Sequence, residues 1–283
     1  MIKVVTDSTS YLDNRITKEL DIRILSLKVE FQGETFREVD LENKAFYEMM
    51  DKRGIPKSSQ PAIGEFIEAF ESIIKQGHEI LGVFLSEKMS GTLSTAMMAK
   101  EMVLKDYPEA KIELMDSTSN CMQLGFAVEA GAKAAKEGKS LTEVRDAVDH
   151  MIKRSRFLFV PKNLKYLEAG GRIGKANALI GGLLSIIPIL TVEDEETTIY
   201  KKVRRKKKAV NEMIAKLKED HQNKTVKEIV IHHIDAFQEA ENLAQSVQKE
   251  IAVPTRVLDI GPVIGLHVGP GAIGIAYYTE EEI

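Results

Sequence analysis

Short apolar runs alternate with amphipathic stretches through the first half of the chain, and this alternation constrains the fold more than any other feature. Ile2 to Val5, Ile80 to Leu85 and Ile112 to Met115 are predicted to be buried strands. Amphipathic stretches such as Gly91 to Lys105 separate them and are predicted to be helices. An alternation of strands and helices predicts a parallel sheet with helices on both faces.

Local signals place several further elements. Ile22 to Phe31 is predicted to be one strand that turns at Gln32-Gly33 into a small hairpin, and a helix is expected from about Glu42 to Met50. Pro61 is expected in the first turn of the next helix, with Gly77 just past its end. Ser140 and Glu143 have the spacing of a capping box, which predicts another helix start.

The pattern changes near Phe157, where glycine pairs appear at Gly170-Gly171 and Gly181-Gly182. A chain of 283 residues exceeds the usual size of one domain, so two domains are expected, at 1–155 and 156–283. The strands predicted for the second domain are 186–192, 198–203, 228–231, 256–260 and 273–278, and its helices are 206–218 and 236–249.

Composition excludes several classes of protein. A net charge of -4 argues against a nucleic-acid partner, since such proteins usually have a basic surplus. The only cysteine, Cys121, cannot form an intramolecular disulfide, which fits a reducing compartment. The N-terminus lacks the features of a signal peptide, and the longest apolar run, Ala178 to Val192, is too short to span a bilayer. We therefore expect a cytoplasmic protein without stable membrane insertion.

The tetrapeptide Asp-Ser-Thr-Ser occurs twice, at Asp7 to Ser10 and at Asp116 to Ser119, each time after a predicted strand. A third hydroxyl-rich segment, Ser86 to Thr95, follows the strand between them. Ligands of open parallel sheets bind beyond the carboxyl ends of the strands. Turns and helix caps would use the same residue types, but three such segments together favour a ligand with a polar head.

The motifs that could indicate a nucleotide site, a metal site or a catalytic nucleophile are each incomplete or in the wrong structural setting. Gly269 to Gly274 has the letters of a dinucleotide fingerprint, but a strand-like run follows it instead of a helix. Gly174-Lys175 lacks the Ser or Thr that must follow in a phosphate-binding loop, and Ser72 with Lys75 lies within a predicted helix. His232 and His233 are adjacent on a predicted strand and point to opposite faces. No catalytic residue, metal or cofactor is expected.

Three segments remain as candidates for ligand contact. Ser58 and Ser59 precede a predicted helix, where an anion is favoured, although an ordinary serine cap would look the same. Ser90 offers a hydroxyl and an amide beside Gly91, which allows a close approach of the chain to a ligand. His267 lies among glycines and apolar residues, either as a buried structural histidine or in contact with a ligand.

These segments belong to a larger set of motifs in which the chain resembles the DegV family. The motifs cover nearly the whole chain and comprise Thr6-Asp7-Ser8-Thr9-Ser10, Ser58-Ser59-Gln60-Pro61, Leu85-Ser86 with Ser90-Gly91-Thr92, Tyr166-Leu167-Glu168-Ala169-Gly170-Gly171-Arg172-Ile173, Pro188-Ile189-Leu190 and His267-Val268-Gly269-Pro270-Gly271. Members of this family resemble FakB, the fatty-acid-binding subunit of bacterial fatty acid kinase. The resemblance implies an N-terminal parallel-sheet α/β domain and a C-terminal α/β domain that has a mixed or antiparallel sheet and holds an acyl chain in a tunnel.

The resemblance also implies roles for individual residues. Ser58 and Ser90 match hydroxyls that bind the fatty-acid carboxylate, and His267 matches a histidine close to them. Ser59, Gly91 and Arg172 are expected to support the same site through backbone or neighbouring contacts. Ile187 stands where many relatives have lysine, so the role of that lysine is lost here.

Physical chemistry agrees with a carboxylate held by hydroxyls. A buried carboxylate is costly unless it is hydrogen-bonded, and hydroxyls and amides supply donors without a fixed counter-charge. A palmitate- or oleate-class tail contributes at most about 11 kcal/mol, at about 0.8 kcal/mol for each of about fourteen methylenes. The resemblance further implies that a separate ATP-dependent kinase subunit converts the bound acid into acyl phosphate. The lack of a phosphate-binding loop explains why the chain would need this partner.

Two alternatives stay open on the sequence alone. A stand-alone small-molecule kinase with a fold like that of dihydroxyacetone kinases would need a nucleotide site, and the chain lacks a credible one. A regulatory protein that senses a lipid would have the same motifs. The acyl length, the unsaturation and the oligomeric state are not specified by the sequence.

Seven basic residues occupy eight positions from Lys201 to Lys208 in an otherwise acidic chain. Most such runs are only solvated surface. By resemblance, Arg204 lies in the segment that FakB-like proteins present to the kinase subunit. A concentrated positive patch speeds docking of an acidic partner, so Arg204 and Lys207 are candidates for kinase docking.

Overall fold

The computed structural model describes residues 1–180 and 186–283, so the predicted Gly181-Gly182 pair lies outside the described residues. The chain divides into two compact units. The first unit contains residues 1–40 and 58–152, and the second contains residues 41–57 and 153–283. The chain therefore leaves the first unit after residue 40, contributes residues 41–57 to the second unit, and returns to the first unit at residue 58.

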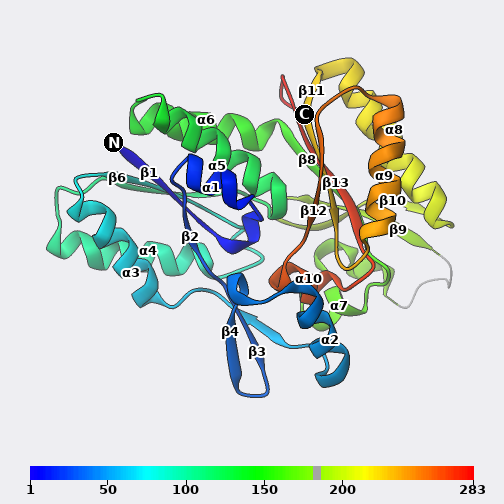
Figure 1. Cartoon of the computed structure of the whole chain (residues 1–283), viewed down its shortest axis with the longest axis horizontal. Coiled ribbons are helices and arrows are strands. Elements are labelled where there is room, and N and C mark those ends of the chain that lie inside the picture. Colours follow the sequence, from blue (N-terminus) through cyan, green and yellow to red (C-terminus); the bar gives the residue numbers. More distant parts are fainter. Residues whose placement is uncertain (181–185) are drawn as a thin grey trace. The chain divides into compact units, whose positions relative to one another are not determined.

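The first unit is built on a parallel sheet, as the alternating pattern predicts (Figure 1). Its strands are β1 (Ile2–Asp7), β2 (Arg23–Leu25), β6 (Glu79–Phe84) and β7 (Ile112–Asp116), in the order β2-β1-β6-β7. Its helices are α1 (Asn14–Glu19), α3 (Ile63–Lys75), α4 (Thr92–Asp106), α5 (Cys121–Lys136) and α6 (Leu141–Lys153), with short 3-10 turns at Ser8–Ser10 and Glu38–Asp40. The parallel-sheet prediction is confirmed.

Aromatic side chains form much of the first unit's core. Phe66 and Phe70 of α3 are fully buried, and the ring of Phe66 lies edge-on to that of Phe84 with centroids 5.6 Å apart. Val5 and Ile80 from neighbouring strands belong to the same cluster. Burial of a large apolar side chain stabilises the fold by about 1.5–3 kcal/mol, so this cluster anchors α3 on the sheet.

The prediction of one strand over Ile22 to Phe31 is wrong. β2 ends at Leu25, and a second strand, β3 (Lys28–Phe31), pairs instead with β4 (Glu34–Arg37). The chain breaks at Ser26, whose hydroxyl donates to the carbonyl of Leu27 at 2.8 Å and accepts from the amide of Val39 at 3.3 Å. The predicted hairpin turn at Gln32-Gly33 is confirmed, with positive φ at both residues. β3 also belongs to a three-stranded sheet of order β4-β3-β5, in which β5 is Lys57–Ser59.

Two predicted helix starts have different outcomes. Pro61 is not in the first turn of α3, because the helix begins at Ile63 and Glu65 accepts the amide of Ala62 at 2.7 Å. The capping box at Ser140 is confirmed, since the amide of Ser140 donates to Glu143 at 2.8 Å and the amide of Glu143 to the Ser140 hydroxyl at 3.4 Å.

The second unit contains a six-stranded mixed sheet, which confirms the predicted class. Its strands are β8 (Ser155–Val160), β9 (Ile187–Glu193), β10 (Glu196–Val203), β11 (Val226–His233), β12 (Thr255–Asp259) and β13 (Ile273–Thr279), in the order β10-β9-β8-β13-β11-β12. β11 and β12 are parallel, and the other pairs are antiparallel. Its helices are α2 (Asn43–Arg53), α7 (Lys165–Ala169), α8 (Lys206–Lys224), α9 (Phe237–Glu250) and α10 (Pro262–Val268), with a 3-10 turn at Gly174–Leu179.

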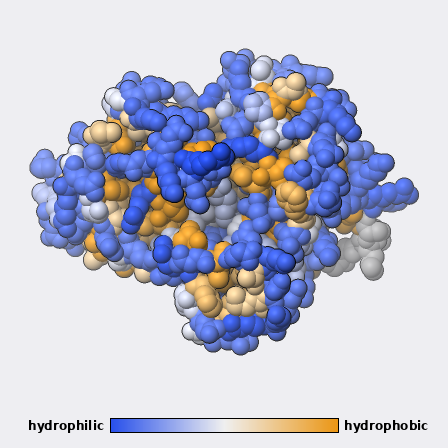
Figure 2. All heavy atoms as spheres, in the orientation of Figure 1, coloured by the Kyte–Doolittle hydropathy of each residue, from blue (hydrophilic) through white to orange (hydrophobic). Residues whose placement is uncertain are grey.

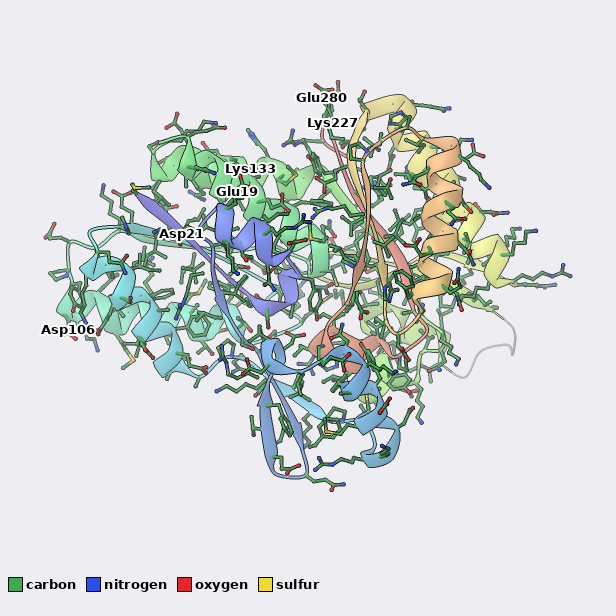
Figure 3. All side chains as sticks on the ribbon, viewed as in Figure 1. Glu19, Asp21, Asp106, Lys133, Lys227 and Glu280 are labelled. Carbon is green, nitrogen blue, oxygen red and sulfur yellow. The ribbon has the colours of Figure 1, made fainter. Side chains whose placement is uncertain are left out.

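Apolar residues of α8 and α9 pack on strands of the second unit's sheet, and Ile187 packs against this core. Figure 2 shows that polar residues cover much of the visible surface of the helices. The charged side chains of Lys227 and Glu280, labelled in Figure 3, form an ion pair of 2.8 Å at the start of β11. None of the helices in residues 1–180 and 186–283 has both the length and the apolar character needed to cross a membrane.

Candidate functional site

The three hydroxyl-rich segments of the first unit follow three adjacent strands. The two Asp-Ser-Thr-Ser repeats begin at the last residues of β1 and β7, and the third segment follows β6, which lies between them. The segments are in contact, because the amide of Ser86 donates to the carbonyl of Ser119 at 2.9 Å. The polar segments therefore gather at the carboxyl ends of the parallel strands, where ligands of such sheets bind.

Ser90 lies at the start of α4. Its amide donates to the carbonyl of Ser86 at 3.1 Å, and its hydroxyl lies 2.9 Å from that of Thr92. The side chain is partly exposed, so the hydroxyl is available to a ligand. The hydroxyl of Ser90 also accepts the amide of Thr92, the first residue of α4, at 3.4 Å, so Ser90 lies directly at the helix terminus and its partial positive charge.

Gln60 joins the Ser58 segment to the Ser90 segment. Its Nε2 atom would be 3.2 Å from a Cβ on Gly91, and it lies 3.5 Å from the hydroxyl of Thr95. A side chain at position 91 would press against the Gln60 amide, so Gly91 lets the two segments lie close together. Within the first unit, the structure brings together the two serine segments that the sequence predicted.

Ser58 and Ser59 do not occupy a helix start, which corrects the prediction for this segment. Both belong to β5, and α3 begins only at Ile63. Ser58 is partly buried and Ser59 is exposed, so Ser58 is the better placed of the two for a shielded ligand. Anion binding by the N-terminus of α3 does not follow from this geometry.

His267 lies in the second unit on α10, which is buried along its whole length. A Cβ placed on Gly170 would overlap Nδ1 of His267, so the imidazole packs directly on the backbone at Gly170. Arg172 donates from Nη1 to the carbonyl of Gly170 at 2.8 Å. Two of the predicted residues, His267 and Arg172, are therefore associated through a glycine.

Burial and, to a smaller extent, the positive charge of Arg172 together lower the pKa of His267 from 6.5 to about 4. The imidazole is consequently neutral near pH 7. A neutral imidazole has one N–H donor and one acceptor, and it can hydrogen-bond a carboxylate without adding a second charge.

Sequence reasoning missed some residues of both regions. In the second unit, Tyr166 of α7 packs where a side chain on Gly269 would lie, and Gly269 has a φ of +88°. The glycines at 170 and 269 thus let α7 and α10 approach closely. The presence of these glycines in the two motifs was the sequence signal for this close contact. In the first unit, Gln60 was part of a noted motif but was not assigned a contact.

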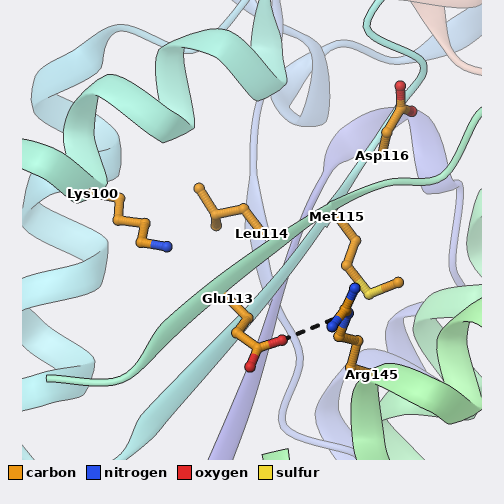
Figure 4. A pocket seen from close by; sticks show the side chains of 6 residues that line it. All are labelled: Lys100, Glu113, Leu114, Met115, Asp116 and Arg145. Carbon is orange, nitrogen blue, oxygen red and sulfur yellow. Dashed lines mark ion pairs between the residues drawn. The ribbon is translucent and has the colours of Figure 1, made fainter. Parts of the chain in front are cut away.

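Two surface cavities are lined by residues other than Ser58, Ser90 and His267. One, of about 350 Å³, is lined by Lys100, Glu113, Leu114, Met115, Asp116 and Arg145 beside β7, and Figure 4 shows the ion pair of 3.8 Å between Arg145 and Glu113. The other, of about 470 Å³ in the second unit, is lined by Glu42, Asn43, Lys44, Tyr47, His233, Asp235, Phe237, Val257 and Asp259. Across the described residues, no three His, Cys, Asp or Glu side chains gather closely enough to hold a metal ion.

Comparison with known proteins decides the family. The family model described as "Uncharacterised protein, DegV family" matches residues 1–280. The chain belongs to the DegV family. A DegV domain-containing protein of Clostridium acetobutylicum is 51% identical over 282 residues, which cover 100% of this chain and 99% of the relative.

Solved structures described as fatty-acid-binding proteins share the fold over nearly the full length. A structure of DegV from Bacillus subtilis, described as a fatty acid binding protein, has a TM-score of 0.88 and 32% identity, and it covers 98% of this chain and 99% of its own. A stearic acid-binding protein from Eubacterium ventriosum has a TM-score of 0.89 and 26% identity, with 99% of both chains covered. Both descriptions concern fatty acids, as the resemblance in sequence implied.

Proposed function

We propose that this DegV protein binds one long-chain fatty acid, of the palmitate or oleate class, and presents its carboxylate to a separate ATP-dependent kinase subunit. The observation that carries the proposal is the full-length match to structures described as fatty acid binding proteins. The hydroxyl-rich segments at the carboxyl ends of the parallel strands support the proposal, because they supply neutral hydrogen-bond donors where ligands of such sheets bind.

In this proposal Ser58 and Ser90 donate hydrogen bonds to the carboxylate, and His267 contributes a neutral imidazole. The low pKa of His267 supports this role, because a neutral donor leaves a carboxylate oxygen nucleophilic enough to accept a phosphoryl group. Ser59, Gly91 and Arg172 support the same headgroup site. Arg172 supplies the one positive charge in this set, close enough to His267 to lower its pKa.

Protein purified from a bacterial host is expected to carry fatty acid in a ratio of about one per chain. The reason is that burial of each methylene contributes about 0.8 kcal/mol, so a long acyl chain dissociates slowly from an apolar site. Native mass spectrometry would show the acid as a discrete added mass, and lipid extraction would identify it. Absence of an acyl chain, together with no uptake of added palmitate or oleate, would contradict the proposal.

The basic run between β10 and α8 supports the partner part of the proposal. Lys201 pairs with Glu212 at 2.7 Å and Lys206 pairs with Glu239, so part of the run is neutralised. Arg204 and Lys207 are exposed and have no ion-pair partner among the described residues. Lysines in the first turn of a helix oppose its dipole, so they cost stability at this position and a role in docking would explain them.

Replacing Arg204 and Lys207 together by glutamate is expected to leave fatty-acid binding unchanged and to slow phosphorylation by the kinase subunit. The expected loss is about tenfold at low ionic strength and smaller at high salt, because salt screens attraction between exposed charges. Kinase-coupled turnover across a salt titration would measure it. Lys18→Glu with Lys105→Glu makes the same charge change elsewhere and should retain the parent rate; equal rates for both double variants would contradict the docking role.

A further inference from the structure

The two Asp-Ser-Thr-Ser repeats form the same turn at the ends of two strands. Oδ1 of Asp7 accepts the amide of Thr9 at 2.9 Å, and Oδ1 of Asp116 accepts the amide of Thr118 at 2.7 Å. Asp7 ends β1 and Asp116 ends β7, and these strands are the two neighbours of β6. The repeats therefore flank the segment that leaves β6 and continues to Ser90.

The second carboxylate oxygen of each aspartate reaches this central segment. Oδ2 of Asp7 accepts the amide of Leu85 at 2.8 Å, and Oδ2 of Asp116 accepts the amide of Glu87 at 3.0 Å. The amide between them, that of Ser86, donates to Ser119, the last residue of the second repeat, at 2.9 Å. Three consecutive backbone amides are thus held by the two repeats.

Ser90 is hydrogen-bonded to the same segment, through the carbonyl of Ser86. The carbonyl of Ser86 accepts the amides of Met89 and Ser90, at 3.0 and 3.1 Å. We propose that Asp7 and Asp116 are positioning residues that hold the segment after β6 so that Ser90 can bind the ligand headgroup. This inference rests on the proposed function, and it assigns the repeats a role that neither direct ligand contact nor simple helix capping describes.

The two aspartates differ in burial, and this difference determines the choice of variant. Asp7 is fully buried and also accepts the hydroxyl of Thr9 at 2.5 Å, so its replacement affects the core of the first unit. Asp116 is partly exposed at the edge of the sheet, beside the cavity of Figure 4. Asparagine at position 116 keeps the shape of the side chain but replaces one carboxylate oxygen by an NH₂ group. Because an NH₂ group donates and does not accept, the side chain can then accept only one of the two backbone amides. Asp116→Asn therefore loosens the segment with little loss of packing.

The test compares Asp116→Asn with Asp13→Asn in fatty-acid-free protein, by displacement of a fluorescent fatty acid. Asp13 is a matched control, because its Oδ1 accepts the amide of Arg15 at 2.7 Å in the same kind of turn elsewhere in the first unit. Asp116→Asn is expected to weaken binding about threefold to tenfold, which is less than the effect of removing the Ser90 hydroxyl, because the variant loosens the segment but keeps that hydroxyl. Asp13→Asn should bind like the parent protein.

A double-mutant cycle separates positioning from a general effect on stability. If Asp116 acts through Ser90, then Asp116→Asn should change affinity less than about twofold when Ser90 is already alanine. Equal losses in both backgrounds, or parent-like affinity of Asp116→Asn while Ser90→Ala is weakened, would overturn the inference and leave the proposed function intact. A parent protein that takes up no fatty acid would overturn the proposed function itself, and the inference with it.

Discussion

Replacing Ser90 by alanine is expected to weaken fatty-acid binding about tenfold to a hundredfold. The loss of one hydrogen bond to a buried charged group costs about 1.5–3 kcal/mol, which corresponds to this range of dissociation constants. The carbonyl of Ser86 accepts the Ser90 amide in either protein, so the change removes the hydroxyl and its contacts with Thr92. Displacement titration with palmitate and with oleate would measure the effect.

Ser94→Ala provides the matched control for this prediction. Ser94 lies in the same helix, α4, and its hydroxyl donates to Glu87 at 3.3 Å. The control loses a hydroxyl of the same kind, so binding should stay within about twofold of the parent. If Ser90→Ala and His267→Ala both bind fatty acid like the parent protein, the headgroup assignment is wrong.

The parallel sheet could be predicted because its strands are nearly continuous apolar runs. β1 and β6 have neighbours on both sides and are covered by helices, so their sequences carry a strong signal over a few residues. The same signal places the hydroxyl-rich segments at strand ends. Because the strands are parallel, these segments must all lie at the same, carboxyl-terminal end of the sheet.

The missed elements have physical reasons. All seven residues of α10 are buried, so the segment Pro262–Val268 lacks the polar face that makes a helix recognisable. The strand predicted over Ile22 to Phe31 is apolar over most of its length. Hydrogen bonds of the Ser26 hydroxyl, and that of the Leu27 amide to the Ser8 hydroxyl at 3.0 Å, mark the place where the chain leaves one sheet for another. Such contacts depend on tertiary structure and leave no periodic pattern.

The candidate site likewise has features that the sequence pattern predicts and features that depend on tertiary contacts. The serines were found because hydroxyls after strands have a known use, whereas the roles of Asp7 and Asp116 depend on amides about 78 and 29 residues away in the sequence. The packing of His267 on Gly170 joins segments almost a hundred residues apart. In both cases the sequence supplied the residue types, and the fold supplied their partners.

The free energy of unfolding is expected to fall as the pH falls from 6.5 toward 4. Burial lowers the pKa of His267 to about 4 and that of His232 to about 3, both from 6.5. In this window the unfolded chain binds protons that the folded protein excludes, so stability rises with pH and is lost on acidification. Each buried histidine contributes at most about 1.4 kcal/mol per pH unit.

His267→Gln isolates one of these contributions. Between pH 6.5 and 4.5, the unfolding free energy of the parent should decrease by about 2–3 kcal/mol more than that of the variant. Urea unfolding of fatty-acid-free protein at several pH values would measure the difference. The pKa of buried Asp7 is raised by burial and acts in the opposite direction above pH 3.8, but this contribution is common to both proteins and cancels.

His150→Gln removes an exposed histidine and serves as the control for the loss of an imidazole as such. A curve for His267→Gln that runs parallel to the parent's would show that the imidazole of His267 protonates readily in the folded protein. A readily protonated imidazole would pair with a carboxylate as a cation, and that would contradict the neutral headgroup site proposed for this DegV protein. The pH dependence of stability therefore tests the chemistry of the site without requiring the ligand.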